Sequence, residues 1–338
     1  MRMTERIDIV GIDALYSNKN VLITGGLGFI GSNLARHLVQ AGAHVTVVDS
    51  LIPEYGGNLF NVRGLEGQIR INISDVRDDH SMKYLVKSQD FLFNLAGQTS
   101  HMDSMENPFN DLEINARAQL SILEACRHHN PGIKIVFAST RQIYGKPDYL
   151  PVDESHLLRP VDVNGINKLS GEFYHLLYNN VYGIRACALR LTNTYGPRMR
   201  IKDARQTFVG IWIKRILENE PFEVWNGNQL RDFTYVDDCV EALLLAGIDE
   251  GVNGHFFNLG GDKVISLKDL ADVLVEINGK GSYSIHEFPE NRKKIDIGDY
   301  YSDFSKFKQL VGWTPTISLK EGLTRTLEYF RLHKVHYI

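Results

Sequence analysis

Cysteine, long apolar runs and excess charge are all scarce in this sequence. Three cysteines occur, Cys126, Cys187 and Cys239, far apart in the chain, which argues against a disulfide framework and against a cysteine metal site. No run approaches the roughly 18 apolar residues of a membrane-spanning helix, and residues 1–20 lack the apolar segment of a signal peptide. A formal net charge of −4 gives no general attraction to nucleic acid or to an anionic membrane. The sequence therefore predicts a soluble, cytoplasmic protein without a bound metal.

The first half of the chain alternates β-rich runs with helical patterns. The runs typical of buried parallel strands are NVLITGG, HVTVVDS, FLFNLAG, KIVFAST and IRACALRLTN. Amphipathic segments lie between them, among them residues 30–40 and 109–128. This alternation predicts an α/β fold with a doubly wound, Rossmann-like parallel sheet. Ligands of such sheets bind outside the carboxyl ends of the strands, so functional residues should follow VLIT, FNLA, VFAS and LRLT.

A change of rhythm divides the chain, whose 338 residues exceed the usual size of one core. After about Asn193 the sequence becomes loop-rich and then combines helices with short strands. We expect an N-terminal extension over residues 1–19 and the parallel-sheet domain over residues 20–190. A smaller, partly interleaved α/β substrate domain is expected over residues 191–338, with some segments returning to the first domain.

A glycine-rich turn, TGGLGFIG, follows the first strand and opens a helix. Glycine permits a tight turn and close approach to a pyrophosphate, whose charge the helix N-terminus attracts. Asp49 follows Gly31 by 18 positions, where its carboxylate would bind an adenosine ribose and repel a 2′-phosphate, which favours NAD over NADP. The residues predicted to contact the cofactor in this region are Gly25, Gly28, Phe29, Ile30, Gly31, Asp49 and, at the adenine, Asp75 and Val76.

Further motifs extend this pattern along the chain. TGGLGFIGSNLARHL, NLAGQ, FASTRQIYG, LRLTNTYGPR and LRDFTYVDD occur in this order, and together they resemble the extended short-chain dehydrogenase/reductase family of NAD-dependent nucleotide-sugar epimerases and dehydratases. The resemblance implies bound NAD, a nucleotide-diphosphate sugar as substrate, and oxidation of a sugar hydroxyl, usually at carbon 4, often followed by return of the hydride. It also implies a homodimer paired through residues 109–128 and 167–181 in a four-helix bundle.

The same resemblance implies roles for individual residues. Leu95 and Ala96 of NLAGQ lie beside the cofactor, and Gln98 contacts the substrate. Thr140 matches the residue whose hydroxyl bonds the reacting sugar hydroxyl. Lys168 matches the lysine that binds the nicotinamide ribose and lowers the pKa of a neighbouring tyrosine. The remaining matches to substrate-binding positions are Asn193, Arg231 on the diphosphate and Arg292.

Two regions depart from the family pattern. Dehydratases follow the threonine with an Asp-Glu pair, and pentose-forming decarboxylases keep the Glu, whereas this chain has Arg141 and Gln142. Elimination is therefore disfavoured. Asn164 stands four residues before Lys168, where the family has tyrosine, and an amide cannot take the hydroxyl proton. Loss of a positioned base commonly costs about 10²–10⁴ in rate.

Three explanations of the absent tyrosine remain: another group substitutes, Asn164 is an inactivating substitution, or the chain is a binding relative. His101 is the leading substitute, because the loop after NLAG borders the sugar and imidazole titrates near neutrality. The first hypothesis is an NAD-dependent nucleotide-sugar 4-epimerase with Thr140, Asn164, Lys168 and His101 at its catalytic site. The alternatives are a nucleotide-sugar dehydrogenase, a 4,6-dehydratase and a cofactor-binding pseudoenzyme.

Overall fold

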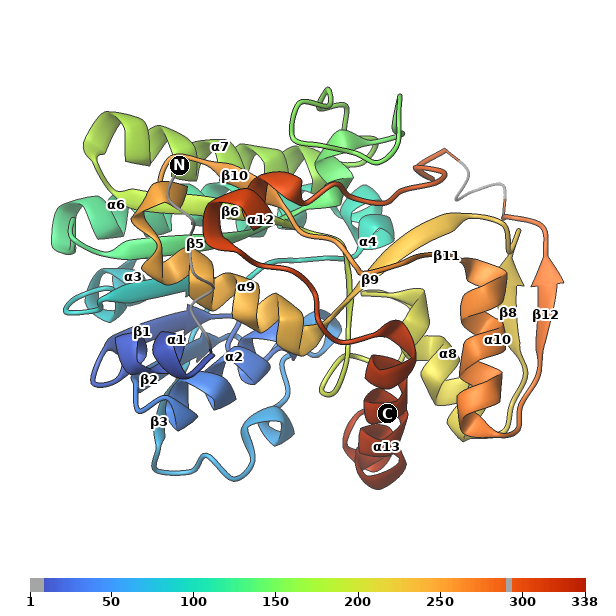
Figure 1. The fold of residues 1–338 in the computed structure, drawn as a ribbon. Coiled ribbons are helices and arrows are strands. Elements are labelled where there is room, and N and C mark those ends of the chain that lie inside the picture. The colour runs from blue at the N-terminus through green and yellow to red at the C-terminus, as the bar shows by residue number, and fades with distance from the viewer. Residues whose placement is uncertain (1–8, 290–293) are drawn as a thin grey trace.

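A seven-stranded parallel sheet forms the centre of the computed structural model, which describes residues 9–289 and 294–338 (Figure 1). Its strand order is β10-β6-β5-β4-β1-β2-β3, and every neighbouring pair is parallel. The strands are β1 (Asn20–Thr24), β2 (His44–Asp49), β3 (Ile69–Ile73), β4 (Phe91–Asn94), β5 (Lys134–Thr140), β6 (Arg185–Leu191) and β10 (Phe256–Asn258). The predicted Rossmann-like sheet is confirmed. The strand order reverses at β1, which leaves a crevice at the carboxyl ends there.

Helices cover both faces of this sheet. They are α3 (Asp79–Leu85), α6 (Ala118–His129) and α7 (Val163–Tyr182) on one face, and α1 (Ile9–Tyr16), α2 (Phe29–Gln40) and α9 (Val236–Ile248) on the other. Successive side chains of a strand point to opposite faces. Accordingly Val21 and Ile23 of β1 pack under the second set of helices, whereas Leu22 packs under the first. The continuous apolar runs in the sequence reflect this burial on both sides.

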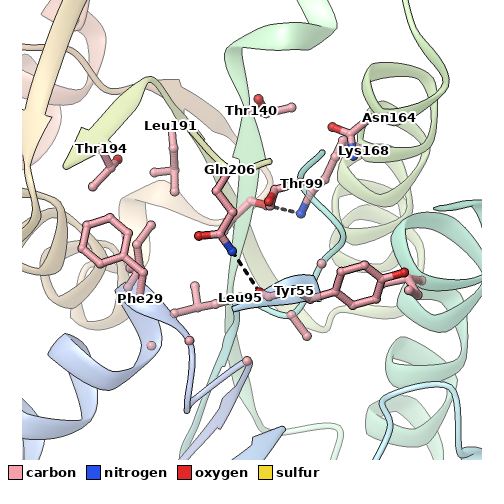
Figure 2. A pocket seen from close by; sticks show the side chains of 18 of the residues that line it. Phe29, Tyr55, Leu95, Thr99, Thr140, Asn164, Lys168, Leu191, Thr194 and Gln206 are labelled. Atoms are coloured by element: carbon pink, nitrogen blue, oxygen red, sulfur yellow. Dashed lines mark hydrogen bonds between the residues drawn. The ribbon is translucent and has the colours of Figure 1, made fainter. Parts of the chain in front are cut away.

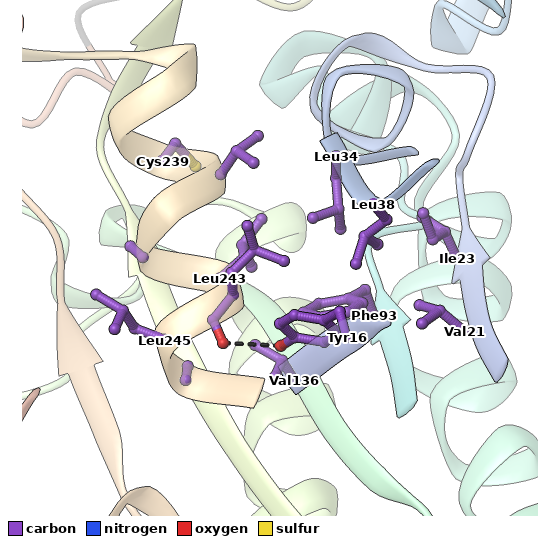
Figure 3. Packing of buried hydrophobic residues seen from close by; sticks show 14 of the residues in the cluster. Tyr16, Val21, Ile23, Leu34, Leu38, Phe93, Val136, Cys239, Leu243 and Leu245 are labelled. Atoms are coloured by element: carbon purple, nitrogen blue, oxygen red, sulfur yellow. Dashed lines mark hydrogen bonds between the residues drawn. The ribbon is translucent and has the colours of Figure 1, made fainter. Parts of the chain in front are cut away.

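Helix α1, from the predicted N-terminal extension, packs against α9 (Figure 3). Tyr16 is fully buried, and its hydroxyl donates a hydrogen bond to the carbonyl of Leu244 at 2.8 Å. Its ring centroid lies 4.9 Å from that of Phe91 and 6.2 Å from that of Phe93. Because a buried tyrosine hydroxyl needs a polar partner, this contact fixes α1 on the core of the large sheet.

The second half of the chain builds a smaller lobe with a core of its own. Its strands are β7 (Asn193–Tyr195), β9 (Leu230–Tyr235) and β11 (Val264–Ser266) in one sheet, and β8 (Phe222–Trp225) with β12 (Tyr283–His286) in another. Its helices are α8 (Phe208–Leu217), α10 (Leu267–Asn278) and α13 (Leu319–His333). Strand β10 and helix α9 come from the same half of the sequence but return to the large sheet.

Short helical segments complete the fold. They are α4 (His101–Glu106), α5 (Pro108–Leu112), α12 (Ser305–Val311), the π-helical turn Glu113–Arg117, and the 3₁₀ turns Pro53–Tyr55, Leu59–Val62, Arg141–Tyr144, Glu250–Val252 and Lys334–His336. Among the described residues, no helix combines the length and apolar character needed to cross a membrane.

Candidate active site

A cavity of about 290 Å³ lies at the carboxyl edge of the large sheet. Figure 2 shows Asn164 and Lys168 projecting from α7 on one side of it, with Phe29 of α2 on the other. The sequence-predicted residues that line the cavity are Gly25, Gly28, Phe29, Ile30, Gly31, Asp49, Asp75, Val76, Leu95, Ala96, His101, Thr140, Asn164, Lys168 and Asn193. Residues predicted for the cofactor and residues predicted for the sugar therefore share this cavity.

The glycine turn fits a group that must approach the backbone closely. Gly25 has a φ of +68°, in the left-handed region that favours glycine. A Cβ added to Gly31 would lie 2.3 Å from the Gly25 carbonyl oxygen, so no side chain fits there without moving the turn. Helix α2 begins at Phe29 with its N-terminus at the cavity. These features suit the pyrophosphate of a dinucleotide, which binds at helix N-termini.

Asp49 is held in place at the end of β2. Its two carboxylate oxygens accept hydrogen bonds from the backbone N–H groups of Leu27 at 3.1 Å and Leu51 at 2.9 Å. Burial raises the pKa of Asp49, and the backbone hydrogen bonds act in the opposite direction. Each carboxylate oxygen keeps a lone pair that can accept from a ribose hydroxyl. The position is therefore suited to the adenosine end of a dinucleotide.

Lys168 is buried on the second turn of α7. Its ammonium group donates a hydrogen bond to the carbonyl of Ala138 at 3.0 Å. Burial lowers the pKa of Lys168 to about 8, and the carboxylate of Asp111 acts in the opposite direction. A Cβ added to Gly97 would lie 2.9 Å from the Lys168 Nζ. Glycine at this position in NLAGQ thus makes room for the ammonium group.

Thr140 is the last residue of β5, in a part of the strand that hydrogen bonds hold in place. Its Oγ1 accepts the backbone N–H of Gln142 at 3.2 Å, which leaves its own hydrogen to donate to a ligand. The preceding residue, Ser139, donates to Glu172 at 2.5 Å, and Glu172 forms a fully buried ion pair with Arg190 at 2.5 Å. Because satisfied buried polar networks are rigid, the strand end presents the Thr140 hydroxyl in a fixed position.

Asn164 belongs to a buried amide network. Its Nδ2 donates to the carbonyl of Gln98 at 2.8 Å and to the carboxylate of Asp111 at 3.0 Å. The same carboxylate accepts from the side-chain amides of Asn115 at 3.0 Å and Asn167 at 2.8 Å. Three amide donors compensate for the burial of this acid. Asn164 thus has a structural role that involves no proton transfer.

His101 lies in a second polar cluster. Its Nδ1 lies 2.8 Å from an oxygen of Asp162, and its Nε2 lies 2.8 Å from the side-chain nitrogen of Gln142. Asp162 is buried, and its other oxygen caps α7 by accepting the backbone N–H of Gly165 at 2.6 Å. The His101 side chain is 34% exposed and lines the cavity. The cluster therefore joins the start of α4 to the start of α7.

Two predicted substrate residues are buried away from the cavity lining, and a third lies outside the described residues. Gln98 was expected to contact the substrate, but the loop after β4 turns it inward, where its amide donates to the Ser100 carbonyl at 2.9 Å. Arg231 donates to the carbonyl of Leu230 at 2.8 Å. Burial and the nearby charge of Arg141 lower the pKa of Arg231 to about 10. The third residue is Arg292.

Arg141 brings a buried positive charge to the cavity. Its Nη2 donates to the side-chain oxygen of Asn193 at 3.0 Å, and its guanidinium group lies 5.1 Å from the ring centroid of Tyr300. Its Nη1 is buried without a hydrogen-bond partner among the described residues, and burial lowers the pKa of Arg141. A buried guanidinium donor with a spare N–H suits an anionic ligand.

Sequence reasoning missed several polar residues of this site. Tyr55, Thr99 and Gln206 line the cavity, and the Gln206 amide donates to the Tyr55 carbonyl at 2.9 Å (Figure 2). These residues come from loops far apart in the sequence and belong to none of the motifs. Asp162 did carry a signal, because an aspartate before a helical pattern is a typical N-cap.

The chain belongs to the NAD dependent epimerase/dehydratase family, whose model matches residues 21–260, and is accordingly an NAD-dependent enzyme. A putative UDP-glucose 4-epimerase of Methanocaldococcus jannaschii is 34% identical over 92% of this chain and 98% of its own length. The structure of a UDP-glucose 4-epimerase from Thermotoga maritima with UDP-glucose is 31% identical with a TM-score of 0.84, over 93% of this chain and 99% of that one. A UDP-glucuronic acid 4-epimerase from Bacillus cereus, in complex with UDP-glucuronic acid and NAD, is 28% identical with a TM-score of 0.82 over the same shares.

Proposed function

We propose that the protein is a nucleotide-sugar epimerase that acts by transient oxidation at sugar carbon 4. The observation that carries this proposal is the shared cavity, into which the glycine turn and the side chains of Thr140 and Lys168 all open. The glycine turn, Asp49 and Lys168 would hold NAD, which would supply a hydride acceptor for the transient oxidation of the sugar. The relatives described above include 4-epimerases of UDP-glucose and UDP-glucuronic acid, which supports a nucleotide-diphosphate sugar as substrate.

In this proposal each side chain at the sugar end has a separate task. Thr140 donates a hydrogen bond to the hydroxyl that is oxidised, and Lys168 binds the nicotinamide ribose. Arg141 and Asn193, which line the cavity, bind the diphosphate, and Arg231 adds its positive charge from outside the lining. Support for this last role comes from the pKa values of the two arginines. Burial lowers the pKa of both, and the charge of Arg141 lowers the pKa of Arg231 further. An anion bound nearby would offset this cost.

Epimerisation is favoured over elimination by the residues next to Thr140. Arg141 and Gln142 occupy the positions that follow it, and neither is a carboxylic acid that could remove and donate the protons of water loss. A dehydrogenase would release the keto sugar instead of reducing it again. A pseudoenzyme would bind the sugar nucleotide without reducing NAD.

Product analysis tests the proposal directly. The purified protein is incubated with UDP-, GDP-, CDP- and dTDP-sugars, and the products are read by mass spectrometry and NMR. An epimer of unchanged mass is the expected result. Loss of water would indicate a dehydratase, net formation of NADH with a released keto sugar would indicate a dehydrogenase, and binding without turnover would indicate a pseudoenzyme.

A homodimer and a cytoplasmic location are part of the proposal. Helix α7 exposes an apolar stripe formed by Ile166, Phe173, Leu177 and Val181, each about half exposed, and apolar patches of this kind mark protein interfaces. Two copies paired through α7 would cover the stripe in a two-fold arrangement. Light scattering at micromolar concentration should therefore report twice the chain mass. Three buried, unpaired cysteines suit a reducing cytoplasm.

A further inference from the structure

We propose that His101 and Asp162 replace the absent tyrosine, with His101 as the base that takes the sugar hydroxyl proton and Asp162 as its positioning residue. This inference rests on the proposed function, because a base is needed only if a sugar hydroxyl is oxidised. His101 carries the one imidazole among the residues that line the cavity. Asn164 cannot take the proton, since its amide nitrogen already donates to Gln98 and Asp111 and has no accessible pKa.

The contact with Asp162 determines which nitrogen of His101 can act as the base. Nδ1 lies 2.8 Å from an oxygen of the Asp162 carboxylate, although the angles fall outside hydrogen-bond geometry. A lone pair on Nδ1 would face the negative charge at this distance, so the proton of the neutral ring is favoured on Nδ1 and the lone pair is left on Nε2. Asp162 is buried, and its other oxygen is fixed by the backbone N–H of Gly165. A carboxylate held in this way both orients the imidazole and stabilises the imidazolium that proton transfer creates.

Gln142 can accommodate both protonation states of His101. Its side-chain nitrogen lies 2.8 Å from Nε2, and its Oε1 is buried without a partner among the described residues. The NH₂ group donates to the neutral ring. After rotation of the amide by half a turn, the oxygen accepts from the imidazolium N–H. The backbone N–H of Gln142 also bonds the Thr140 hydroxyl oxygen at 3.2 Å, so the same residue links the base to the sugar-binding threonine.

The proton and the electrons then follow separate paths. A sugar hydroxyl that bonds Thr140 donates to Nε2 of His101 in place of Gln142. Its O–H bond breaks, and the proton moves to Nε2. The C–H bond of the same carbon breaks as a hydride leaves for the oxidised nicotinamide, and a C=O bond forms. The sugar thus loses two electrons and the cofactor gains them; return of the hydride and the proton reverses the step.

Single-turnover reduction of bound NAD tests the base. His101→Ala should lower the rate by about 10²–10⁴, the usual contribution of a general base, with sugar-nucleotide binding retained. Asp162→Asn keeps a good N-cap for α7 but should lower the rate to a smaller extent. Added imidazole should restore part of the activity of His101→Ala and none of that of Thr140→Val. The control is His44→Ala, at the exposed first residue of β2 on the amino edge of the sheet, which should match the parent.

Nitrogen NMR of the histidine rings tests the geometry without turnover. His101 of the parent should carry its proton on Nδ1, and Asp162→Asn should shift it toward Nε2. Unchanged rates in His101→Ala, or an Nε2-protonated ring in the parent, would overturn the base assignment and leave the epimerase proposal standing. Failure of the proposed function has a different signature: the parent itself reduces no bound NAD with any of the nucleotide sugars, and the base assignment fails with it.

Discussion

The two ends of the cavity bind by different means. At the cofactor end the backbone makes the site, through the turn at Gly25 and Gly31 and the N-terminus of α2. At the sugar end side chains make the site. There Asn164 stands where the sequence resemblance implies a tyrosine, and His101 lies 2.8 Å from Asp162 nearby. Backbone geometry tolerates no substitute residue, whereas side-chain chemistry can be redistributed among neighbours. This difference between the two ends is what we expect if the sugar end has adapted to asparagine at position 164.

Gly31→Val should produce the largest effect. It tests the claim that the cofactor end of the cavity, where the backbone makes the site, tolerates no substitution. The Cβ would meet a backbone oxygen at 2.3 Å, so the turn must move away from the pyrophosphate. NAD affinity should fall by more than about 10³-fold, equivalent to ~4 kcal/mol. Calorimetric titration of NAD measures it. The control is Gly132→Ala, where an added Cβ meets nothing within 4 Å; equal affinities of the two variants would contradict the backbone model.

Thr140→Val examines the side-chain end by removing one hydroxyl at nearly constant volume. Loss of a positioned donor at the reacting oxygen typically costs about 10²–10³ in rate. We expect that decrease in single-turnover NAD reduction, with NAD affinity unchanged because the glycine turn is untouched. Thr140→Ser keeps the hydroxyl and should retain most of the rate. A decrease of NAD affinity in the valine variant would mean that the two ends are not separable.

The same division shows what sequence can predict. The sheet followed from continuous apolar runs such as that of β5, because burial on both faces leaves an unbroken run of apolar residues. The cofactor end followed from glycine spacing, because a local turn needs local residues. The sequence predicts residues 1–19 as an extension, yet the core position of Tyr16 depends on Leu244, far along the chain, and no local pattern encodes such a contact.

The sugar end was less accessible to prediction. The loop after NLAG predicts His101 near the sugar, but its neighbour Asp162 lies on another segment, and the two meet only through the packing of α4 on α7. Asp111 was missed because a single aspartate in a helical pattern usually faces solvent. Gln98 was placed at the substrate from its motif alone, whereas hydrogen bonds to its own loop turn it inward. Polar networks of this kind depend on tertiary contacts that sequence spacing does not specify.

Lys168→Met separates catalysis from stability at the boundary between the two ends. Burial lowers the pKa of Lys168 from 10.5 in the ordinary state to about 8, so between these values the unfolded chain binds more protons than the folded one. The free-energy cost of burying the charged Lys168 side chain is therefore full below pH 8, and it vanishes as the pH rises to 10.5. At neutral pH the nucleotide-free variant should be more stable than the parent by about 3 kcal/mol, although catalytically impaired.

Chemical denaturation of the Lys168→Met variant and the parent from pH 7 to 10.5 measures this difference, which should shrink steadily above pH 8. Lys83→Met, on the exposed surface of α3, serves as the control and should show no such pH dependence. A Lys168→Met variant that is less stable than the parent at neutral pH would show that the ammonium group is compensated by its hydrogen bond to Ala138 and by the charge of Asp111.

Asn164→Tyr should have the smallest effect on the rate. It gives the sharpest test of whether the base function has moved from position 164 to neighbouring side chains. If the sugar end had merely lost its base, tyrosine beside Lys168 would raise the rate of NAD reduction by up to about 10²–10⁴. The structure favours the opposite sign. The side chain at position 164 is buried, and tyrosine would remove an amide donor from Asp111, which costs about 1–3 kcal/mol of stability. We therefore expect lower stability and about a tenfold lower rate, measured by denaturation and single turnover.

The control is Asn180→Tyr, at an exposed position near the C-terminal end of α7, which should change neither the stability nor the rate. A large gain in the rate of NAD reduction from Asn164→Tyr would contradict the proposed role of His101. A site that already has a base should gain little from a second one.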